Sequence, residues 1–171
     1  EHVGMVGGRL LFPDRTVQHA GLVFSDQSTL AYHAYLGDKQ DAPHVLKQRE
    51  VTAVTGACMA MRAADWAKLR GFNPLYVNGC EDVDLCLRMQ RVLKRKILYV
   101  PSSLLIHHEG KSPGRGRHIL QNRLIFAQLW GGKTDPDDMD HYAKDGFMQI
   151  LHTQNDSWLA QHYRTISVSV T

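Results

Sequence analysis

The order of apolar and polar residues predicts strands and helices that follow one another along the chain. Apolar runs bounded by turn residues predict strands over residues 3–12, 51–61, 97–100 and 104–106. Apolar residues that recur on one face predict helices over residues 63–70, 82–94 and 119–130, with a further helix start at 135–138. On the helix over 82–94, that face carries Leu85, Met89 and Val92. Strands that alternate with helices predict an α/β fold.

Glycines and one proline modify this prediction. The first predicted strand contains Gly4, Gly7 and Gly8, where a missing side chain allows another segment to approach the backbone closely. Pro101 has no N–H group, so we expect the third predicted strand to stop there and the fourth to be separate. Residues 25–50 are polar and irregular and predict a long excursion, which in a compact domain is usually functional or mobile.

Composition narrows the class of protein. The chain has 171 residues, of which 43% are hydrophobic and 22% are charged, as in an ordinary globular domain. The formal net charge of +3 is too small to mark a nucleic-acid-binding protein. Three cysteines at spacings that fit no zinc site indicate free thiols in a reducing compartment. No apolar run is long enough to span a bilayer, and we expect a cytoplasmic location.

The densest group of carboxylates is Glu81-Asp82-Val83-Asp84, at the start of a predicted helix. Carboxylates held this close repel one another, which raises their pKa. A raised pKa is what a carboxylate needs to act as a general base near neutral pH. Two interpretations are open. The carboxylates cap the first helical turn, or Asp82 is a general base that faces a cleft. In the second case Asp84 pairs with Arg88 one turn later, and Glu81 faces an acceptor.

Two other patterns also have a structural and a functional interpretation. His107-His108 follows a predicted strand, where histidines are either structural or, because open α/β sheets bind ligands at strand ends, metal ligands. The basic residues Lys111, Arg115 and Arg117 lie among glycines. They form either a solvated flexible loop or a mobile loop that closes over a diphosphate.

Small residues interrupt the second predicted strand at Thr55-Gly56-Ala57-Cys58. They allow either close packing against a helix or a floor on which a flat ligand such as a sugar can lie. Gly7-Gly8 lacks the spacings of a nucleotide-binding fingerprint. No histidine is placed by spacing to activate Cys58 as a nucleophile.

Several motifs occur in a characteristic order over residues 3–130. They lie at residues 6–14, 17–21, 54–62, 69–73, 81–88, 99–101, 106–108 with Ser112, and 122–123. In this order they resemble the second half of a family-2-like glycosyltransferase with a GT-A fold. The resemblance implies a partial GT-A-like (Rossmann-like) fold, in which helices flank a mixed sheet and the N-terminal nucleotide-binding βαβ half is missing. Residues 131–171 would be a C-terminal helical extension or linker.

The resemblance also implies roles for the candidate residues. Asp82 would take the proton from an acceptor hydroxyl during inverting transfer, and Glu81 would hold the acceptor or support Asp82. His107, or His108 in its place, would complete the coordination of Mg²⁺ or Mn²⁺ on the diphosphate. The expected substrate-binding residues are Gly56 and Ala57 at the donor sugar, Lys111, Arg115 and Arg117 over the diphosphate, and Asp84.

The implied partners are a nucleotide diphosphate-sugar donor and a saccharide or lipid-linked saccharide acceptor, in polysaccharide or cell-envelope glycan synthesis. The implied activity is of the hexosyltransferase kind, with peripheral association at the inner face of the membrane. The family's Asp-x-Asp metal motif has no counterpart at a strand end of this chain. We therefore expect a piece of a longer protein, which by itself binds donor poorly and turns over little. The alternatives are a non-catalytic carbohydrate- or partner-binding domain and, with weaker support, a metal-dependent hydrolase.

Overall fold

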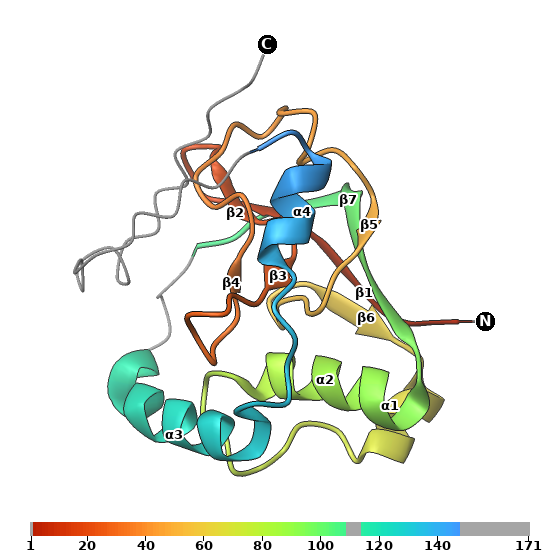
Figure 1. The fold of residues 1–171 in the computed structure, drawn as a ribbon, viewed down its shortest axis with the longest axis vertical. Helices are drawn as coiled ribbons and strands as arrows, with labels where there is room; N and C mark the ends of the chain where they lie inside the picture. Colours follow the sequence, from red (N-terminus) through yellow and green to blue (C-terminus); the bar gives the residue numbers. More distant parts are fainter. Residues whose placement is uncertain (1, 109–113, 148–171) are drawn as a thin grey trace.

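The order of elements differs from the alternation of strands and helices that the sequence pattern predicts, because six strands precede the first helix and only β7 follows among the helices. The structure is a computed structural model that describes residues 2–108 and 114–147. Its elements are β1 (Val3–Leu11), β2 (Val17–His19), β3 (Leu22–Val23), β4 (Tyr32–His33), β5 (Arg49–Glu50), β6 (Met59–Met61), α1 (Ala63–Leu69), α2 (Glu81–Leu93), β7 (Lys96–Ile106), the 3₁₀ helix η1 (Arg115–His118), α3 (Ile119–Trp130) and α4 (Asp138–Lys144) (Figure 1). The predicted first strand and the predicted helices are confirmed. Within these residues, no helix has the length and apolar character needed to cross a membrane.

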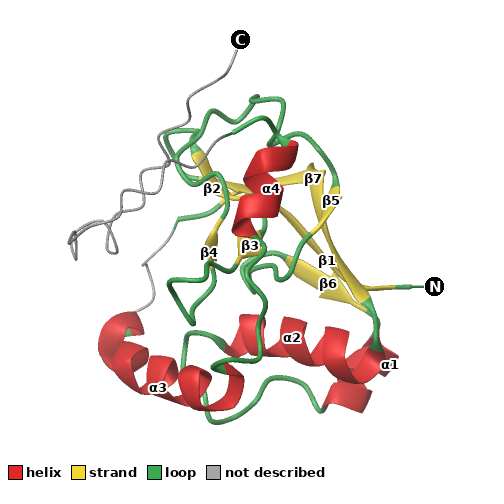
Figure 2. Cartoon of the chain, viewed as in Figure 1, coloured by secondary structure: helices red, strands yellow, loops and turns green. Residues whose placement is uncertain are grey.

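A mixed sheet forms the centre of the molecule (Figure 2). Its strands lie in the order β2-β1-β7-β5, and β6 pairs with β1. β1 runs parallel to β7 and antiparallel to β2 and β6, while β5 runs antiparallel to β7. β3 and β4 form a second, two-stranded sheet. Since α2 packs on β1 and β7 and α1 packs beside α2, the predicted α/β class with a mixed sheet is confirmed.

The prediction that a strand stops at Pro101 is wrong. β7 continues through this proline, and both of its halves pair with β1. The register shifts between Gly8 and Arg9, which pair with Val100 and Leu104 respectively. The proline therefore lies in an irregular part of the ladder, where its missing N–H group costs no hydrogen bond to β1.

The predicted strand over residues 51–61 forms a ladder only at its end, in β6. Val51, Ala53 and Val54 are buried, but among residues 51–58 the bridge pairing is limited to Ala53 with Leu22. They lie close against β1, because a methyl group added to Gly7 would come within 2.5 Å of the Val54 side chain. The expected close approach at Gly7 is confirmed.

The excursion over residues 25–50 is long but packed. Ala34, Tyr35 and Val45 are buried in the main core. The hydroxyl of Tyr99 on β7 donates a hydrogen bond to the backbone oxygen of Val45 at 2.8 Å. The excursion thus contributes to the core, which its irregular sequence pattern does not indicate.

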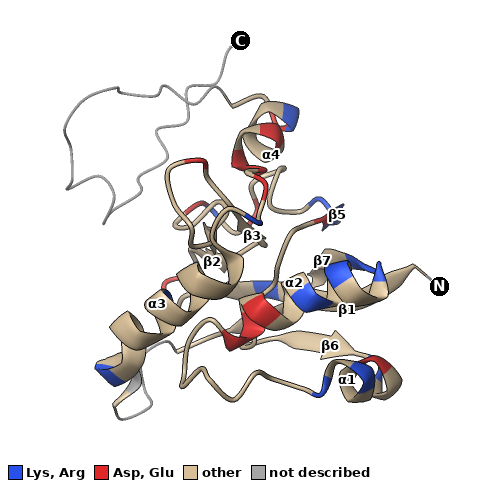
Figure 3. Ribbon diagram, turned by 60° about the horizontal axis from the view of Figure 1, so that its bottom comes forward, with Lys and Arg blue, Asp and Glu red and all other residues tan. Residues whose placement is uncertain are grey.

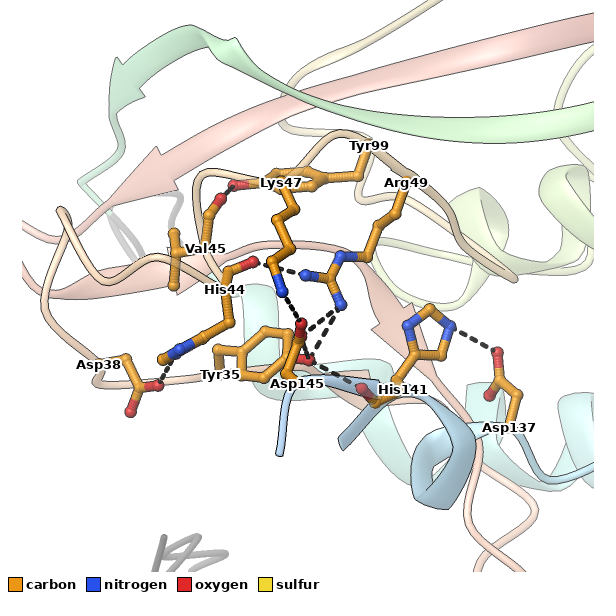
Figure 4. Close-up of polar contacts among 10 residues, drawn as sticks. All are labelled: Tyr35, Asp38, His44, Val45, Lys47, Arg49, Tyr99, Asp137, His141 and Asp145. Carbon is orange, nitrogen blue, oxygen red and sulfur yellow. Dashed lines mark hydrogen bonds and ion pairs between the residues drawn. The ribbon is translucent and has the colours of Figure 1, made fainter. Parts of the chain in front are cut away.

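The segment that contains α4 is anchored to this excursion through Asp145 (Figure 4). Asp145 Oδ2 accepts hydrogen bonds from Arg49 Nη1 at 2.6 Å and from the Tyr35 hydroxyl at 2.5 Å, and Oδ1 accepts one from Lys47 Nζ at 2.7 Å. Tyr142 of α4 is buried against Tyr35, with ring centroids 5.1 Å apart. α4 therefore packs on the same core as the strands, while a domain division at residue 130 stays a prediction.

This anchor predicts a specific dependence of stability on pH. Burial by itself raises the pKa of Asp145, but hydrogen bonds from Arg49, Lys47 and Tyr35 outweigh it and lower the pKa from 3.8 to about 2. A carboxylate with a lowered folded-state pKa stabilises the fold above its unfolded pKa, and this contribution is lost as the pH falls through the folded value. We expect the free energy of unfolding to lose about 1–2 kcal/mol from this residue between about pH 5 and pH 2.

Urea unfolding across this pH range would measure the effect. Asp145→Asn is expected to have a shallower loss of stability with acid than the unmodified protein. Asp41→Asn is the matched control, since Asp41 is exposed. Parallel pH curves for all three proteins would contradict the assignment.

Candidate functional site

A cavity of about 480 Å³ opens between the two-stranded sheet, the start of α2 and α3. Five of the predicted site residues line it, namely Gly56, Ala57, Glu81, Asp82 and His107. These residues come from three separate parts of the chain, so the fold brings them together. Leu22, Leu30 and Phe126 add apolar surface to the lining. A cavity with apolar surface and a few convergent polar groups is typical of a small-molecule site.

The start of α2 holds the Asp82 carboxylate against the loop that contains Gly56. Asp82 Oδ2 accepts a hydrogen bond from the Gly56 N–H at 2.8 Å, and Oδ1 accepts one from the Val83 N–H at 2.8 Å. Each carboxylate oxygen can accept a second hydrogen bond. The half-buried carboxylate is therefore fixed at the cavity and can still receive a proton from a bound hydroxyl group.

The other two carboxylates of the cluster have different surroundings. Glu81 lines the cavity, and its Oε2 accepts a hydrogen bond from the Gly79 N–H at 2.5 Å. Asp84 is 1% exposed and accepts hydrogen bonds from Arg88 Nε at 2.7 Å and from Trp130 Nε1 at 2.9 Å. Its predicted pairing with Arg88 is confirmed. Its position in the core, outside the cavity lining, differs from the expectation that it contacts substrate. Figure 3 shows this group of carboxylates at the start of α2.

His107 is the histidine of the predicted pair that lines the cavity, and His108 lies outside the lining and is exposed. His107 Nδ1 lies 2.7 Å from Gln18 Oε1. Because an amide oxygen can only accept, this contact favours the tautomer of the neutral ring that has its proton on Nδ1 and its lone pair on Nε2. An imidazole held in this way by a second residue has the form in which histidine binds a metal ion.

A metal centre needs more than this single imidazole. Within residues 2–108 and 114–147, no group of three His, Cys, Asp or Glu side chains is placed to hold a metal ion. Mg²⁺ and Mn²⁺ prefer several oxygen ligands. The described residues therefore do not form a site for either ion on their own, although His107 offers one ligand.

The predicted basic loop is only partly covered by the structure. Lys111 lies outside the described residues, as does the side chain of Arg115. Arg117 belongs to η1 and is exposed, and it does not line the cavity. That this basic loop closes over a diphosphate therefore stays a prediction.

Four further residues line the cavity that the sequence did not single out as site residues. His33 of β4, Asn78, and Asn122 and Arg123 of α3 all line it. The Asn122 side chain accepts from the Val77 N–H at 3.1 Å and donates to the Val77 oxygen at 2.8 Å, which fixes the loop before α2. Asn122 and Arg123 belong to the last motif of the family resemblance, whereas His33 lies in the excursion that carries no recognisable pattern.

Comparison with known proteins gives several relatives, three of which have names that describe a function. The O-antigen biosynthesis protein RfbC of Myxococcus xanthus is 35% identical over 64% of this chain and 9% of its own length. The N-acetylglucosaminyl-diphospho-decaprenol L-rhamnosyltransferase of Mycobacterium tuberculosis is 34% identical over 40% of this chain and 22% of its own length. The rhamnosyltransferase WbbL of Escherichia coli is 40% identical over 31% of this chain and 20% of its own length. No family model and no solved structure matches the chain.

An α/β fold with a cavity beside the acidic start of α2 is compatible with an enzyme that transfers a chemical group. The relatives confirm the resemblance to family-2-like glycosyltransferases that the ordered motifs indicate. The chain spans only about a tenth to a fifth of the length of these relatives, between 9% and 22%.

Proposed function

We propose that the protein is a glycosyltransferase that acts in cell-envelope glycan synthesis. Its donor is a nucleotide diphosphate-sugar and its acceptor a saccharide or lipid-linked saccharide. The observation that carries this proposal is the Asp82 carboxylate, which the Gly56 N–H holds at 2.8 Å beside a cavity of about 480 Å³. The rhamnosyltransferase names of two relatives support sugar transfer, and one of these names includes a diphospho-decaprenol-linked substrate.

In the proposed reaction Asp82 is the general base. The acceptor hydroxyl oxygen attacks the anomeric carbon and forms the new glycosidic bond. The bond from that carbon to the donor phosphate oxygen breaks, and the nucleoside diphosphate leaves with the electron pair. The hydroxyl proton passes to the Asp82 carboxylate. A single displacement of this kind inverts the configuration at the anomeric carbon.

The remaining roles follow from the cavity lining. Gly56 and Ala57 offer a flat surface to the donor sugar, and Glu81 is the second carboxylate that faces the acceptor. We propose further that the fold is the acceptor-side part of a GT-A domain. His107 Nε2 would offer one ligand to Mg²⁺ or Mn²⁺, and oxygen atoms of the diphosphate would offer others.

The test is a transfer assay on the full-length gene product. The protein is incubated with a panel of uridine, thymidine and guanosine diphosphate-sugars, among them activated L-rhamnose, and with a diphospho-polyprenol-linked saccharide. We expect a glycosylated acceptor from one donor, with the anomeric configuration inverted when the product is analysed by NMR. Retention of configuration would exclude the single displacement. Saccharide binding without turnover of any donor would favour the alternative, a non-catalytic carbohydrate-binding domain.

A further inference from the structure

Three segments, namely α1, the loop between α1 and α2, and α3, lie along the lower side of the molecule in Figure 1. Side chains join them. The rings of Trp66 on α1 and Phe72 in the loop meet edge to face, with centroids 5.0 Å apart. The Asn122 side chain of α3 hydrogen-bonds to both the N–H and the oxygen of Val77 in the same loop. The three segments therefore adjoin one another.

Large apolar side chains are exposed on all three segments. They are Trp66 on α1, Phe72, Leu75 and Val77 in the loop, and Ile119, Leu120 and Leu124 on α3, each between 39% and 71% exposed. Leu120 and Leu124 are one turn apart and lie on the same face of α3. Single exposed apolar residues are ordinary on a soluble protein. A group of them on adjoining segments indicates a surface that binds a partner or a membrane.

The exposed charges on these segments have one sign. Within residues 62–79 and 117–130 they belong to Arg62, Lys68, Arg70, Arg117 and Arg123. The single acidic residue of these two ranges is Asp65, which is 1% exposed and forms ion pairs with Arg62 at 2.9 Å and Arg95 at 3.4 Å. The exposed apolar and basic residues together are called the apolar–basic surface. Its chemistry suits a partner that is both apolar and anionic.

The apolar–basic surface adjoins the cavity that contains Asp82. Ile119 and Arg123 belong to the surface and also line the cavity. Asn78, which follows Val77 of the surface, lines it as well. A molecule that lies on this surface is therefore next to the lining of the proposed active site.

We propose that the apolar–basic surface binds the protein to the anionic face of a lipid membrane. The apolar side chains enter the boundary between headgroups and acyl chains, and the Lys and Arg side chains contact lipid phosphate groups. The choice of a membrane as partner rests on the proposed function, since a lipid-linked saccharide acceptor is held in a membrane. Binding through this surface brings such an acceptor to the side of the molecule at which the cavity lies.

Cosedimentation of the full-length gene product with lipid vesicles tests the proposal without any sugar donor. We expect binding to vesicles of phosphatidylcholine mixed with phosphatidylglycerol to be about tenfold tighter than binding to phosphatidylcholine alone, because each basic residue gains from the anionic lipid. An increase in salt from about 0.1 M to about 1 M should remove most of this preference, because it screens the charges. Equal binding to the two kinds of vesicle would overturn the proposal.

Two double variants test the apolar and the basic part of the surface separately. Leu120→Gln with Leu124→Gln removes the apolar contact and keeps good helix formers on α3. Lys68→Glu with Arg70→Asn removes basic charge at α1, and asparagine tolerates the positive φ of 60° at residue 70. We expect each double variant to weaken binding to the anionic vesicles about tenfold or more.

The matched control is Leu36→Gln with Lys39→Glu, which changes one exposed apolar and one exposed basic residue of the excursion. It should bind the vesicles as tightly as the unmodified protein does. Unchanged binding in both surface variants, or an equal loss in the control, would overturn the proposal. So would an unmodified protein that binds no vesicles and loses thermal stability in Leu120→Gln with Leu124→Gln, because another protein segment would then cover the surface.

A transfer assay separates this inference from the function on which it rests. The surface variants should raise the KM for a lipid-linked acceptor in anionic vesicles about tenfold and leave the KM for a water-soluble saccharide acceptor unchanged. Normal transfer to both acceptors by a protein that binds no vesicles would overturn the membrane surface alone. Vesicle binding that the surface variants weaken, without transfer from any donor, would overturn the proposed glycosyltransferase and retain the membrane surface.

Discussion

Replacing Asp82 with asparagine in the full-length protein is expected to lower kcat for sugar transfer about 100-fold to 10,000-fold, the usual contribution of a general base. Asparagine has nearly the shape of aspartate, and its amide oxygen can still accept the hydrogen bond from the Gly56 N–H. It cannot take a proton from the acceptor hydroxyl. KM for the nucleotide sugar should change little, because the loss falls on the chemical step.

Three comparisons make this experiment specific. Asp41→Asn removes an exposed carboxylate outside the cavity and should retain the full rate. Glu81→Gln changes the neighbouring carboxylate and should raise the acceptor KM more than it lowers kcat. The thermal unfolding of Asp82→Asn must match that of the unmodified protein, so that a loss of activity cannot be explained by a loss of folded protein. A folded Asp82→Asn with more than about a third of the normal kcat would rule out Asp82 as the base.

The helices could be predicted because local signals define them. α3 has the predicted bounds, Ile119–Trp130, and α2 begins at the carboxylates that favour a helix N-terminus. Periodicity was a weaker guide to the buried face. Leu85 and Met89 are fully buried, but Val92 is 64% exposed, and the residue of that turn that packs against the core is Leu93.

The sheet depends on contacts between distant segments, and these were harder to predict. Pro101 predicts the end of a strand by its own chemistry, yet β7 continues because β1 pairs with it on both sides of the proline. The buried residues at 51–54 have the composition of a strand, but their position against Gly7 is decided by packing. Tertiary context thus overrides local propensity in both places.

The candidate site was predictable where several motifs converge. The resemblance places Gly56, Asp82 and His107 in one site, and all three line the same cavity. His33 could not be found in this way, since the excursion that contains it has no periodic pattern. Its place at the cavity depends on the pairing of β3 with β4, which brings His33 opposite Leu22.

Replacing Asp84 with alanine is expected to lower the free energy of unfolding by about 3 kcal/mol, because it leaves the largely buried Arg88 guanidinium without its carboxylate partner. Asp84 and Arg88 have side chains that are 2% and 21% exposed, and their ion pair is 2.7 Å long. Trp130 Nε1, which donates to the other oxygen of Asp84 at 2.9 Å, would also lose its acceptor. Trp130 of α3 belongs to a buried hydrophobic cluster with Leu87 of α2 and Phe126 of α3, so the change should loosen the packing of α3 against α2.

A surface ion pair of similar length is the matched control for this prediction. Lys96 and Glu50 lie 2.8 Å apart, with side chains that are 56% and 54% exposed, so Glu50→Ala should cost less than about 1 kcal/mol. Chemical denaturation of both variants, followed by tryptophan fluorescence, would measure the two changes. Equal effects of the two substitutions would show that burial does not decide the strength of the Asp84 pair. A stable Asp84→Ala with a raised KM would instead give Asp84 a role in substrate binding, despite its position in the core.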